Sequence, residues 1–331
     1  MAVARTHRHL TGVTVSNAVL ITGATSGIGH AAAVQFAEAG HAVTLTGRTG
    51  DRAAAAARGI AEQTGHPHVD SVALDLGDPS GIEQAARQLA GSRFDALVLN
   101  AGMLSPADRR FTDDGIELTF ASSLIGHHRL VMALLANDGL AEDARIVIAG
   151  SEAARGDVPM MTLADLDRLA AEHHDGDLSA AAVDLIRGVQ PTKFKPNDTY
   201  GTAKLFVAWW AAALDRRLPE TMTAMAVSPG STPDTQAGRN ANFLTRKVML
   251  PMLKLMPKSM NMAATAGDAA ARYAEALALP STDAAGSFYA SKPKKMSGPL
   301  HRMSYPHIDR LDHQEAAWQA IVQVAGVGLP D

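Results

Sequence analysis

Residues 18–30, which read AVLITGATSGIGH, join a short apolar run to a glycine-rich turn. The apolar start predicts a strand, and the Ala-rich stretch from Ile28 to Ala39 predicts a helix that ends at Gly40. Glycines between a strand and a helix let the backbone turn tightly and approach a diphosphate, whose charge then lies at the helix N-terminus. The stretch therefore predicts a dinucleotide-binding turn, with these cofactor-binding residues: Gly23, Thr25, Ser26, Gly27, Ile28 and Gly29.

The same turn has two other interpretations. A P-loop needs a lysine followed by serine or threonine, and His30 and Ala31 stand there instead, which excludes it. Glycines that serve only tight packing are the second alternative. The strand before the turn and the helix after it favour the nucleotide.

Short apolar runs alternate with longer segments of helical period along the rest of the chain. Strands that are apolar on both faces and separated by helices are typical of a parallel sheet covered on both sides. We therefore expect a single α/β domain built on a doubly wound, Rossmann-like parallel sheet. Further strands are expected at residues 42–46, 72–74, 96–99, 146–149, 223–227 and 288–290, and further helices at 52–62, 79–90, 116–136, 199–218 and 308–324.

The composition excludes several classes of function. The 331 residues include 30 basic and 34 acidic side chains, so no broad basic surface is expected and nucleic acid is excluded as a partner. Cysteine is absent, which excludes disulfides, thiolate zinc sites and a cysteine nucleophile. The adjacent pairs His127-His128 and His173-His174 lack metal-ligand spacing, so we expect no metal and interpret them as solvated or capping residues. We also expect no transmembrane segment, and a cytoplasmic protein.

The end of the second predicted strand indicates which nucleotide the turn binds. A dinucleotide site normally places an acid there, on the ribose hydroxyls. This strand ends in Thr46-Gly47-Arg48, with no carboxylate before Asp51. The forked guanidinium of Arg48 suits a 2′-phosphate in charge and geometry, so the sequence predicts NADP, with NADPH preferred over NADH. A solvated surface arginine is the alternative interpretation.

Tyr200 and Lys204 lie one helical turn apart on the same face of a predicted helix. The pKa of a free tyrosine is ~10, and a neighbouring cation lowers that pKa toward the working range of a base. This spacing also occurs by chance on amphipathic helices. Ser151 strengthens the pattern, because it follows the fifth predicted strand, at the edge where parallel sheets bind ligands. Its hydroxyl is suited to hydrogen-bond a carbonyl oxygen while Tyr200 exchanges the proton.

Taken in chain order, these motifs resemble the short-chain dehydrogenase/reductase family. Asn100-Ala101-Gly102 after the fourth strand and Ser228-Pro229-Gly230 after the sixth complete the pattern, which spans residues 18–290. The resemblance implies a nicotinamide-dependent oxidoreductase with a Rossmann-like domain. It also implies cofactor contacts from Asp75, Leu76, Asn100, Ala101, Gly102, Tyr200, Lys204, Pro229 and Gly230.

The resemblance implies roles within the site as well. Tyr200 is the implied acid and base, Lys204 holds the ribose and tunes Tyr200, and Ser151 orients the substrate oxygen. The family usually carries a helix asparagine that supports a proton relay through water. Ser123 occupies that position here, and we expect it to hold a water with a shorter reach.

The gap between Ser151 and Tyr200 is much longer than in the minimal family pattern. With Arg145 and the residues around Tyr200, it is similar to the retinol-dehydrogenase and protochlorophyllide-reductase branch, whose members act on bulky apolar carbonyls or conjugated double bonds. The expected organisation is a leader at 1–17, a single NAD(P)-binding domain at 18–331, an insertion at 155–197, a substrate lid at 236–262 and a C-terminal extension at 291–331. Methionines at spacings of three and four in the lid segment suit an adaptable apolar cover, with core packing or a membrane-surface helix as alternatives.

We therefore expect an NADP(H)-dependent oxidoreductase that interconverts a carbonyl and an alcohol on a fairly large, apolar small-molecule substrate. Two alternatives stay open: a reductase of a conjugated C=C bond, and a non-catalytic nucleotide-sensing protein, which only Ser123 favours. The family often dimerises through the helices that hold Ser123 and Tyr200, so a homodimer or homotetramer is compatible with the sequence.

Overall fold

The computed structural model describes residues 18–189, 193–232 and 263–330. The expected leader at 1–17 and the expected lid at 236–262 therefore lie outside the described residues. Within them, eight strands form one sheet in the order β3-β2-β1-β4-β5-β6-β7-β8. The strands are β1 (Ala18–Ile21), β2 (Ala42–Gly47), β3 (Val69–Ala73), β4 (Phe94–Leu99), β5 (Leu140–Ala149), β6 (Thr223–Val227), β7 (Phe288–Ala290) and β8 (His301–Met303).

Every neighbouring pair from β3 to β7 is parallel, as the sequence predicts, whereas β7 and β8 are antiparallel. The sequence does not predict β8, because three residues with polar His301 and Arg302 show no apolar run. The strand order reverses between β1 and β4, which is the position where doubly wound sheets bind their ligands. The expectation of an α/β fold with a Rossmann-type, mostly parallel sheet is confirmed.

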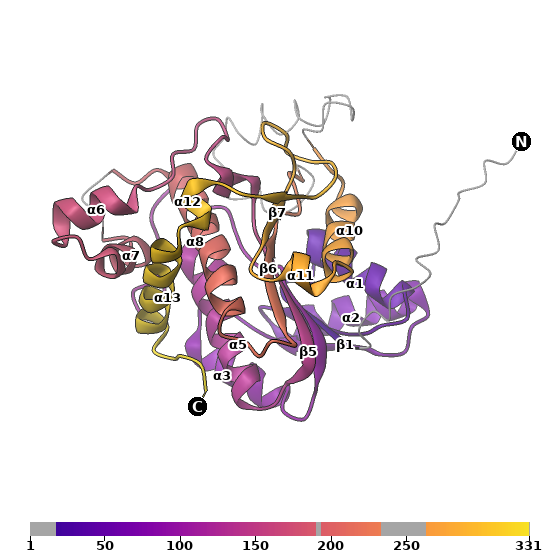
Figure 1. Cartoon of the computed structure of the whole chain (residues 1–331). Helices are drawn as coiled ribbons and strands as arrows, with labels where there is room; N and C mark the ends of the chain where they lie inside the picture. Colours follow the sequence, from indigo (N-terminus) through magenta and orange to yellow (C-terminus); the bar gives the residue numbers. More distant parts are fainter. Residues whose placement is uncertain (1–17, 190–192, 233–262, 331) are drawn as a thin grey trace, which may run out of the picture.

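Helices cover both faces of the sheet (Figure 1). In β1, Val19 and Ile21 pack on one side, whereas Leu20 packs on the other, because successive side chains of a strand point to opposite faces. The first side is covered by α1 (Gly27–Glu38), α2 (Gly50–Thr64) and α10 (Ala266–Leu277), and the second by α3 (Pro79–Gln88), α5 (Gly126–Ala136) and α8 (Pro196–Asp215).

Local sequence explains where several of these helices begin and end. Asp78 caps α3 by accepting a hydrogen bond from the Ser80 N–H, and Pro79 fills the first turn, where a missing N–H costs nothing. Gly65 ends α2 in the left-handed conformation with a φ of 70°. The predicted helix at 116–136 is continuous but contains one π turn, η1 (Ala121–Ile125), between α4 (Leu118–Phe120) and α5.

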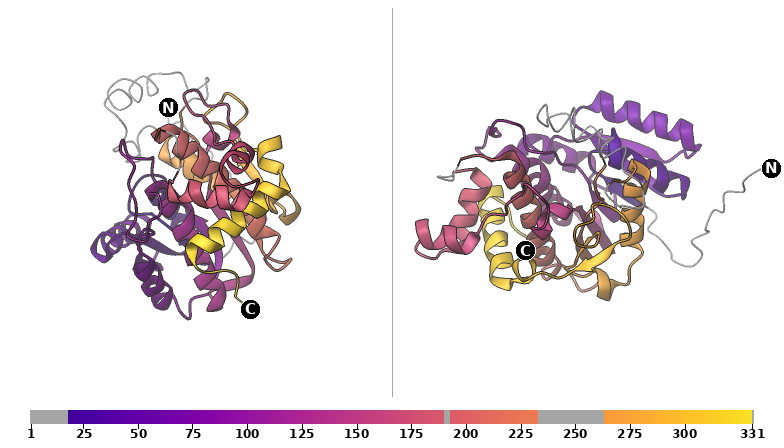
Figure 2. Two further views of the ribbon diagram at one scale, coloured as in Figure 1. Left: turned by 90° about the vertical axis from the view of Figure 1, so that its left-hand side faces the viewer. Right: turned by 90° about the horizontal axis from the view of Figure 1, so that it is seen from above.

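The insertion and the C-terminal extension form a further layer outside α8 (Figures 1 and 2). η2 (Glu152–Arg155) leads into the insertion, which contains α6 (Leu166–His173) and α7 (Leu178–Arg187), and the extension contains α12 (Pro306–Asp309) and α13 (Leu311–Ala325). The single helix expected at 308–324 is broken at Arg310, whose backbone is extended (φ −67°, ψ 113°). There the guanidinium of Arg310 pairs with Asp167 of α6, which ties the two segments together. The remaining short helix is α11 (Ser281–Ala284).

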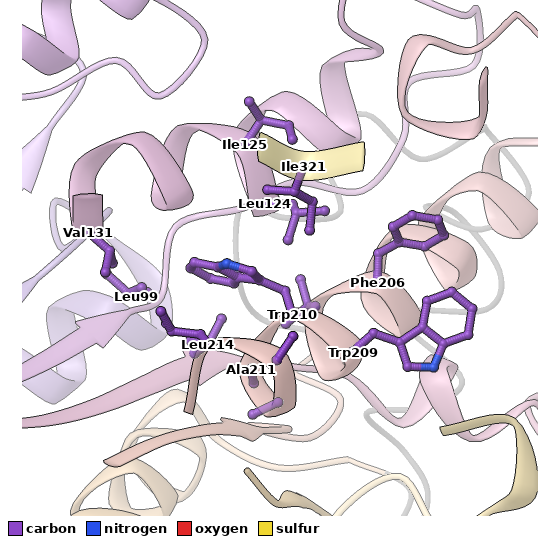
Figure 3. Close-up of a cluster of buried hydrophobic side chains, with 14 of the residues drawn as sticks. Leu99, Leu124, Ile125, Val131, Phe206, Trp209, Trp210, Ala211, Leu214 and Ile321 are labelled. Carbon is purple, nitrogen blue, oxygen red and sulfur yellow. The ribbon is translucent and has the colours of Figure 1, made fainter. Parts of the chain in front are cut away.

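α13 seals the outer side of α5 and α8 (Figure 3). Trp210 of α8 is fully buried, and its indole N–H donates to Nδ1 of His128 on α5 at 3.2 Å. Nε2 of His128 then donates to the Val327 carbonyl at 2.9 Å, and burial lowers the pKa of His128 to about 4. His128 and its neighbour His127 are both completely buried, so their interpretation as solvated residues is wrong. His128 is buried because it packs against Trp210 and Trp318 of α13, whereas the His127 ring lies inside, 2.9 Å from Thr22 Oγ1.

One described helix, Leu118–Ala136, is long and apolar enough to cross a membrane by composition alone. In the fold, 72% of its apolar window is buried, because it packs among α3, α8 and α13. Its apolar character is thus explained by its place in the core.

Gly126, the first residue of α5, lies against the loop after β3 with no space for a side chain. A Cβ there would lie 2.3 Å from the Leu76 carbonyl oxygen, which is backbone and cannot move alone. We expect Gly126→Ala to lower the free energy of unfolding by about 1–3 kcal/mol through overpacking. Gly59→Ala on α2 is the control: a Cβ at Gly59 would meet nothing within 4 Å, so this variant should gain about 0.5–1 kcal/mol. Chemical denaturation of both variants measures the difference, and equal effects would contradict the packing analysis.

Candidate active site

The carboxyl ends of the parallel strands meet at one edge of the sheet and bring the predicted site residues together. The turn after β1 is joined to β2 by two bonds, from Gly23 N–H to Thr46 Oγ1 at 3.3 Å and from Ala24 N–H to the Thr46 carbonyl at 3.0 Å. It is joined to β4 through Asn100, whose Nδ2 donates to the Thr22 carbonyl at 3.0 Å. The glycine turn and the segment after β4 thus form one continuous surface.

The glycines of the turn are required by its geometry. Gly23 has a φ of 66°, and a Cβ there would lie 3.0 Å from Cα and Cβ of Ala101. A Cβ on Gly29 would lie 2.5 Å from the Asn100 amide nitrogen, so only glycine lets α1 approach β4 so closely. Ser26, the N-cap residue of α1, makes no side-chain capping bond, which leaves N–H donors of the first turn directed outward. A cradle of this kind fits a diphosphate.

Arg48 stands beside this cradle. A Cβ on the preceding Gly47 would lie 2.4 Å from Cγ2 of Thr25, which shows how closely the end of β2 approaches the turn. Arg48 is exposed, and among the described residues its guanidinium makes no hydrogen bond or ion pair. Asp75, after β3, is also exposed and accepts from the Gly77 N–H at 3.0 Å, whereas Leu76 is buried against α5.

A buried hydrogen-bonded chain that the sequence does not reveal supports the segment after β4. Thr22 Oγ1 accepts from the Ala101 N–H at 3.0 Å and lies 2.9 Å from Nε2 of His127. The hydroxyl of Tyr273 on α10 donates to Asn100 Oδ1 at 3.1 Å. Burial lowers the pKa of His127 to about 3, so its ring is neutral at physiological pH. Thr22 belongs to the stretch that decides the fold, but nothing in the sequence links it to His127 or links Tyr273 to Asn100.

Ser151, Tyr200 and Lys204 converge where β5 ends. The ammonium of Lys204 is 5% exposed, donates to the Ala149 carbonyl at 2.8 Å and lies 5.9 Å from the centre of the Tyr200 ring. The Ser151 hydroxyl lies close enough to the Tyr200 phenol to lower the pKa of that phenol, and its oxygen accepts from the Ala153 N–H at 3.2 Å. The three side chains therefore share one site, as the sequence predicts for their positions.

Burial decides the protonation of this site. It raises the pKa of Tyr200, because the phenolate loses its solvation; the Ser151 hydrogen bond lowers that pKa, and the negative charge of Glu152 raises it further. Burial also lowers the pKa of Lys204 to about 8. The pKa of Tyr200 is therefore raised above its ordinary value, in contrast to the expected lowering, and the loss of solvation is the largest cause. At neutral pH the phenol is protonated.

Ser123 lies next to Lys204, in the π turn η1. Its hydroxyl is 1% exposed and has no hydrogen-bond partner within the described part of the chain. A Cβ on Gly102 would lie 3.1 Å from Ser123 Oγ and 3.6 Å from Lys204 Nζ, so the two groups flank the same glycine. A buried hydroxyl without a partner calls for a water or a ligand group, which fits a place near a bound cofactor.

The turn after β6 closes the other side of the site. Gly230 has a φ of 88°, and its N–H donates to Oγ of Ser228 at 3.2 Å, with Pro229 between them. Together with the diphosphate cradle, Asn100 and Lys204, this arrangement fits a nicotinamide dinucleotide. The described residues hold no group of three or more His, Asp or Glu side chains arranged for a metal ion.

A separate cavity of about 730 Å³ lies between α8, the insertion and α12–α13. Its lining includes Trp209, Leu163, His307 and Arg155. None of the predicted site residues lines this cavity. It is therefore distinct from the strand edge that holds Ser151 and Tyr200.

Comparisons with known proteins agree with this geometry. A family model described as short chain dehydrogenase matches residues 17–163. Retinol dehydrogenase 13 from Homo sapiens is 27% identical over 253 residues, which cover 74% of this chain and 69% of that protein. The WW domain-containing oxidoreductase from Danio rerio is 30% identical over 249 residues, which cover 74% of this chain but only 56% of that protein.

A solved structure shows the same fold. The L-sorbose reductase from Gluconobacter frateurii, complexed with NADPH and L-sorbose, superposes with a TM-score of 0.61 at 21% identity, covering 85% of this chain and 97% of that chain. In its motifs, its sheet and these relatives, the chain is similar to members of the short-chain dehydrogenase/reductase family of oxidoreductases.

Proposed function

We propose that this protein is an NADP(H)-dependent reductase that interconverts a carbonyl and an alcohol, with Tyr200 as the proton donor and acceptor. The observation that carries the proposal is the convergence of Ser151, Tyr200 and Lys204 at the strand edge beside the glycine cradle. In this arrangement the hydroxyl can bind a carbonyl oxygen and the phenol can pass it a proton, while the charge of the ammonium lies near the phenol.

The protonation state of Tyr200 favours reduction at neutral pH. Because burial raises its pKa, the phenol holds the proton that a developing alkoxide needs. Ser151 donates a hydrogen bond to the same substrate oxygen and so orients it. Lys204 is held by the Ala149 carbonyl, with its remaining donors free for the ribose and its charge near the phenol. The nicotinamide cofactor, when bound, supplies the hydride chemistry.

Arg48 supports a preference for NADPH. Its exposed guanidinium lies at the end of β2, next to the glycine turn, and no carboxylate occupies the position that would bind free ribose hydroxyls. Guanidinium forks match the geometry of a phosphate. The NADPH complex of L-sorbose reductase shows that this fold accommodates that cofactor.

A large apolar substrate is proposed from the relatives. Retinol, named in one of them, is a long apolar alcohol, and a polyprenol dehydrogenase from Mus musculus is 29% identical over 237 residues. Both names describe dehydrogenases of apolar alcohols, which supports this class over reduction of a conjugated C=C bond.

Removal of the phenol tests the mechanism. Tyr200→Phe should lower kcat for ketone or aldehyde reduction by about 10²–10⁴-fold, because the general acid is lost, while the Kd for NADPH stays within a few-fold. Tyr305→Phe, outside the site, is the matched control and should keep its rate. Initial rates on a panel of bulky ketones and aldehydes measure both variants. An active Tyr200→Phe enzyme would exclude Tyr200 as the acid.

Charge reversal at Arg48 tests the cofactor preference. Arg48→Asp should weaken NADPH binding by about tenfold to a hundredfold, since a hydrogen bond to a charged group contributes about 1.5–3 kcal/mol, and should leave NADH binding nearly unchanged. The control is Arg52→Asp, an exposed arginine on α2. Fluorescence titrations of the two variants with NADPH and with NADH give four Kd values, which are compared with those of the wild type. Equal losses of affinity for both nucleotides in Arg48→Asp would remove Arg48 from the site.

The lowered pKa of Lys204 predicts a pH dependence of cofactor affinity. Lys204 is charged below about pH 8 and neutral above it, so a ribose contact made by the ammonium is lost as the pH rises through that value. We expect the Kd of NADPH and of NADH to be constant from pH 6.5 to about 7.5 and then to rise. Lys204→Arg, which keeps the charge, should move the rise to a higher pH. A Kd independent of pH across this range would contradict the assigned role.

A further inference from the structure

A buried ion pair lies directly behind the proposed active site and has no part in the chemistry described so far. Glu152 is the residue after Ser151 and begins η2, whereas Arg272 lies on α10. Arg272 Nη1 is 3.3 Å from Glu152 Oε1, and the two side chains are only 5% and 2% exposed. The pair therefore joins the segment after β5 to a helix on one face of the sheet.

The carboxylate of Glu152 is fully hydrogen-bonded. The Ser228 hydroxyl donates to Oε2, and the Ser291 hydroxyl and N–H donate to Oε1 at 2.9 and 3.3 Å. Ser228 follows β6 and Ser291 follows β7, so one carboxylate links the ends of three neighbouring strands.

The guanidinium of Arg272 binds the same loops from the other side. Nη1 donates to the Ser228 carbonyl at 2.8 Å, and Nη2 donates to Ser291 Oγ at 2.8 Å and to the Gly298 carbonyl. Arg272 also limits the turn after β6, because a Cβ on Gly230 would lie 3.1 Å from its Nη1. The Ser228-Pro229-Gly230 turn is thus held between Glu152 and Arg272.

The pair also places a negative charge near the Tyr200 phenol. Among the described residues, the titratable and charged groups around Tyr200 are Lys204 on its own helix, Glu152 from η2 and Tyr273 from α10, with the neutral His127 of α5 near Lys204. Arg272 of α10 lies behind Glu152 and acts on Tyr273. Glu152 acts on Tyr200 with a negative charge, and Arg272 contacts that carboxylate with a positive one.

Stability alone does not account for such a pair. Desolvation of two buried charges offsets most of their attraction, and apolar residues of similar volume often serve equally well. The positions of Glu152 and Arg272 suit a different purpose, because Glu152 directly follows Ser151 and Arg272 bonds the turn that closes the cofactor site.

We propose that the Glu152–Arg272 pair is a positioning unit for the reaction, which seats the Ser228-Pro229-Gly230 turn against Ser151 and in which Arg272 offsets the negative charge that Glu152 places beside Tyr200. Neither residue touches the substrate. This inference rests on the proposed function, in which Tyr200 holds the transferred proton.

Three variants distinguish the effect of the Glu152 charge from that of the Arg272 charge. Glu152→Gln removes the negative charge but keeps an acceptor oxygen, Arg272→Met removes the positive charge, and the double variant carries neither. Tyr200 is titrated in each by the ultraviolet absorption of tyrosinate, as the difference from the same protein with Tyr200→Phe. Fluorescence titration gives the Kd for NADPH, and circular dichroism checks folding. Arg129→Gln on α5, which breaks the 2.8 Å ion pair of Arg129 with Asp114, is the control.

The proposal predicts shifts of opposite sign. Glu152→Gln should move the Tyr200 titration to lower pH and Arg272→Met to higher pH, by roughly half a unit or more each, because a nearby charge favours the opposite charge state. The double variant should titrate close to the wild type but bind NADPH at least several-fold more weakly, since the turn has lost Arg272. Arg129→Gln should change neither quantity.

Shifts of the same sign, or no shift in folded single variants, would overturn the proposal. If a single variant does not fold, the double variant decides, because it leaves no charge unpaired: unchanged NADPH affinity would overturn the positioning role. A wild-type protein that binds NADPH but reduces no carbonyl compound would overturn the proposed function instead, and the Tyr200 titration and NADPH affinity would still decide the role of the pair.

Discussion

Parallel pairing of β1, β4 and β5 sets the geometry of the site. Val19 pairs with Ala96, and Leu97 pairs with Ile146, with all three strands running in the same direction. Their carboxyl ends therefore lie at one edge, where backbone groups are no longer used by the ladder. That edge is the reason why a glycine turn, an amide and a serine from distant parts of the chain form one site.

Buried polar groups at this edge are held by one another. Asn100 donates a hydrogen bond to the backbone of the glycine turn and accepts one from the Tyr273 hydroxyl. The cofactor cradle is thereby connected to α10. Glu152 and Arg272 tie the ends of β5, β6 and β7 together in the same way. Polar groups removed from water are costly unless paired, so these networks restrict the strand-end loops to a single arrangement. Ser123 differs, because its buried hydroxyl has no partner among the described residues.

The insertion and the C-terminal extension change the surroundings of the site without entering it. Arg310 holds α6 through Asp167, and His128 binds both Trp210 and the Val327 carbonyl. The outer faces of α5 and α8 are consequently covered by α13 of the same chain. A subunit contact through these two helices, which family resemblance suggests, would have to be made around α13 or elsewhere on the surface.

Local periodicity and motif spacing are enough to predict strands β1 to β7, helices α1, α2, α3, α5 and α8, the cradle of Gly23 and Gly29, and the positions of Ser151, Tyr200 and Lys204. They do not predict β8, α6, α7 or α10. How the site groups behave depends on the tertiary structure. The pKa of Tyr200 is raised instead of lowered, since burial is set by segments far away in the chain. The buried state of His127 and the pairing of Glu152 with Arg272, 120 residues apart, likewise depend on packing that no local pattern encodes.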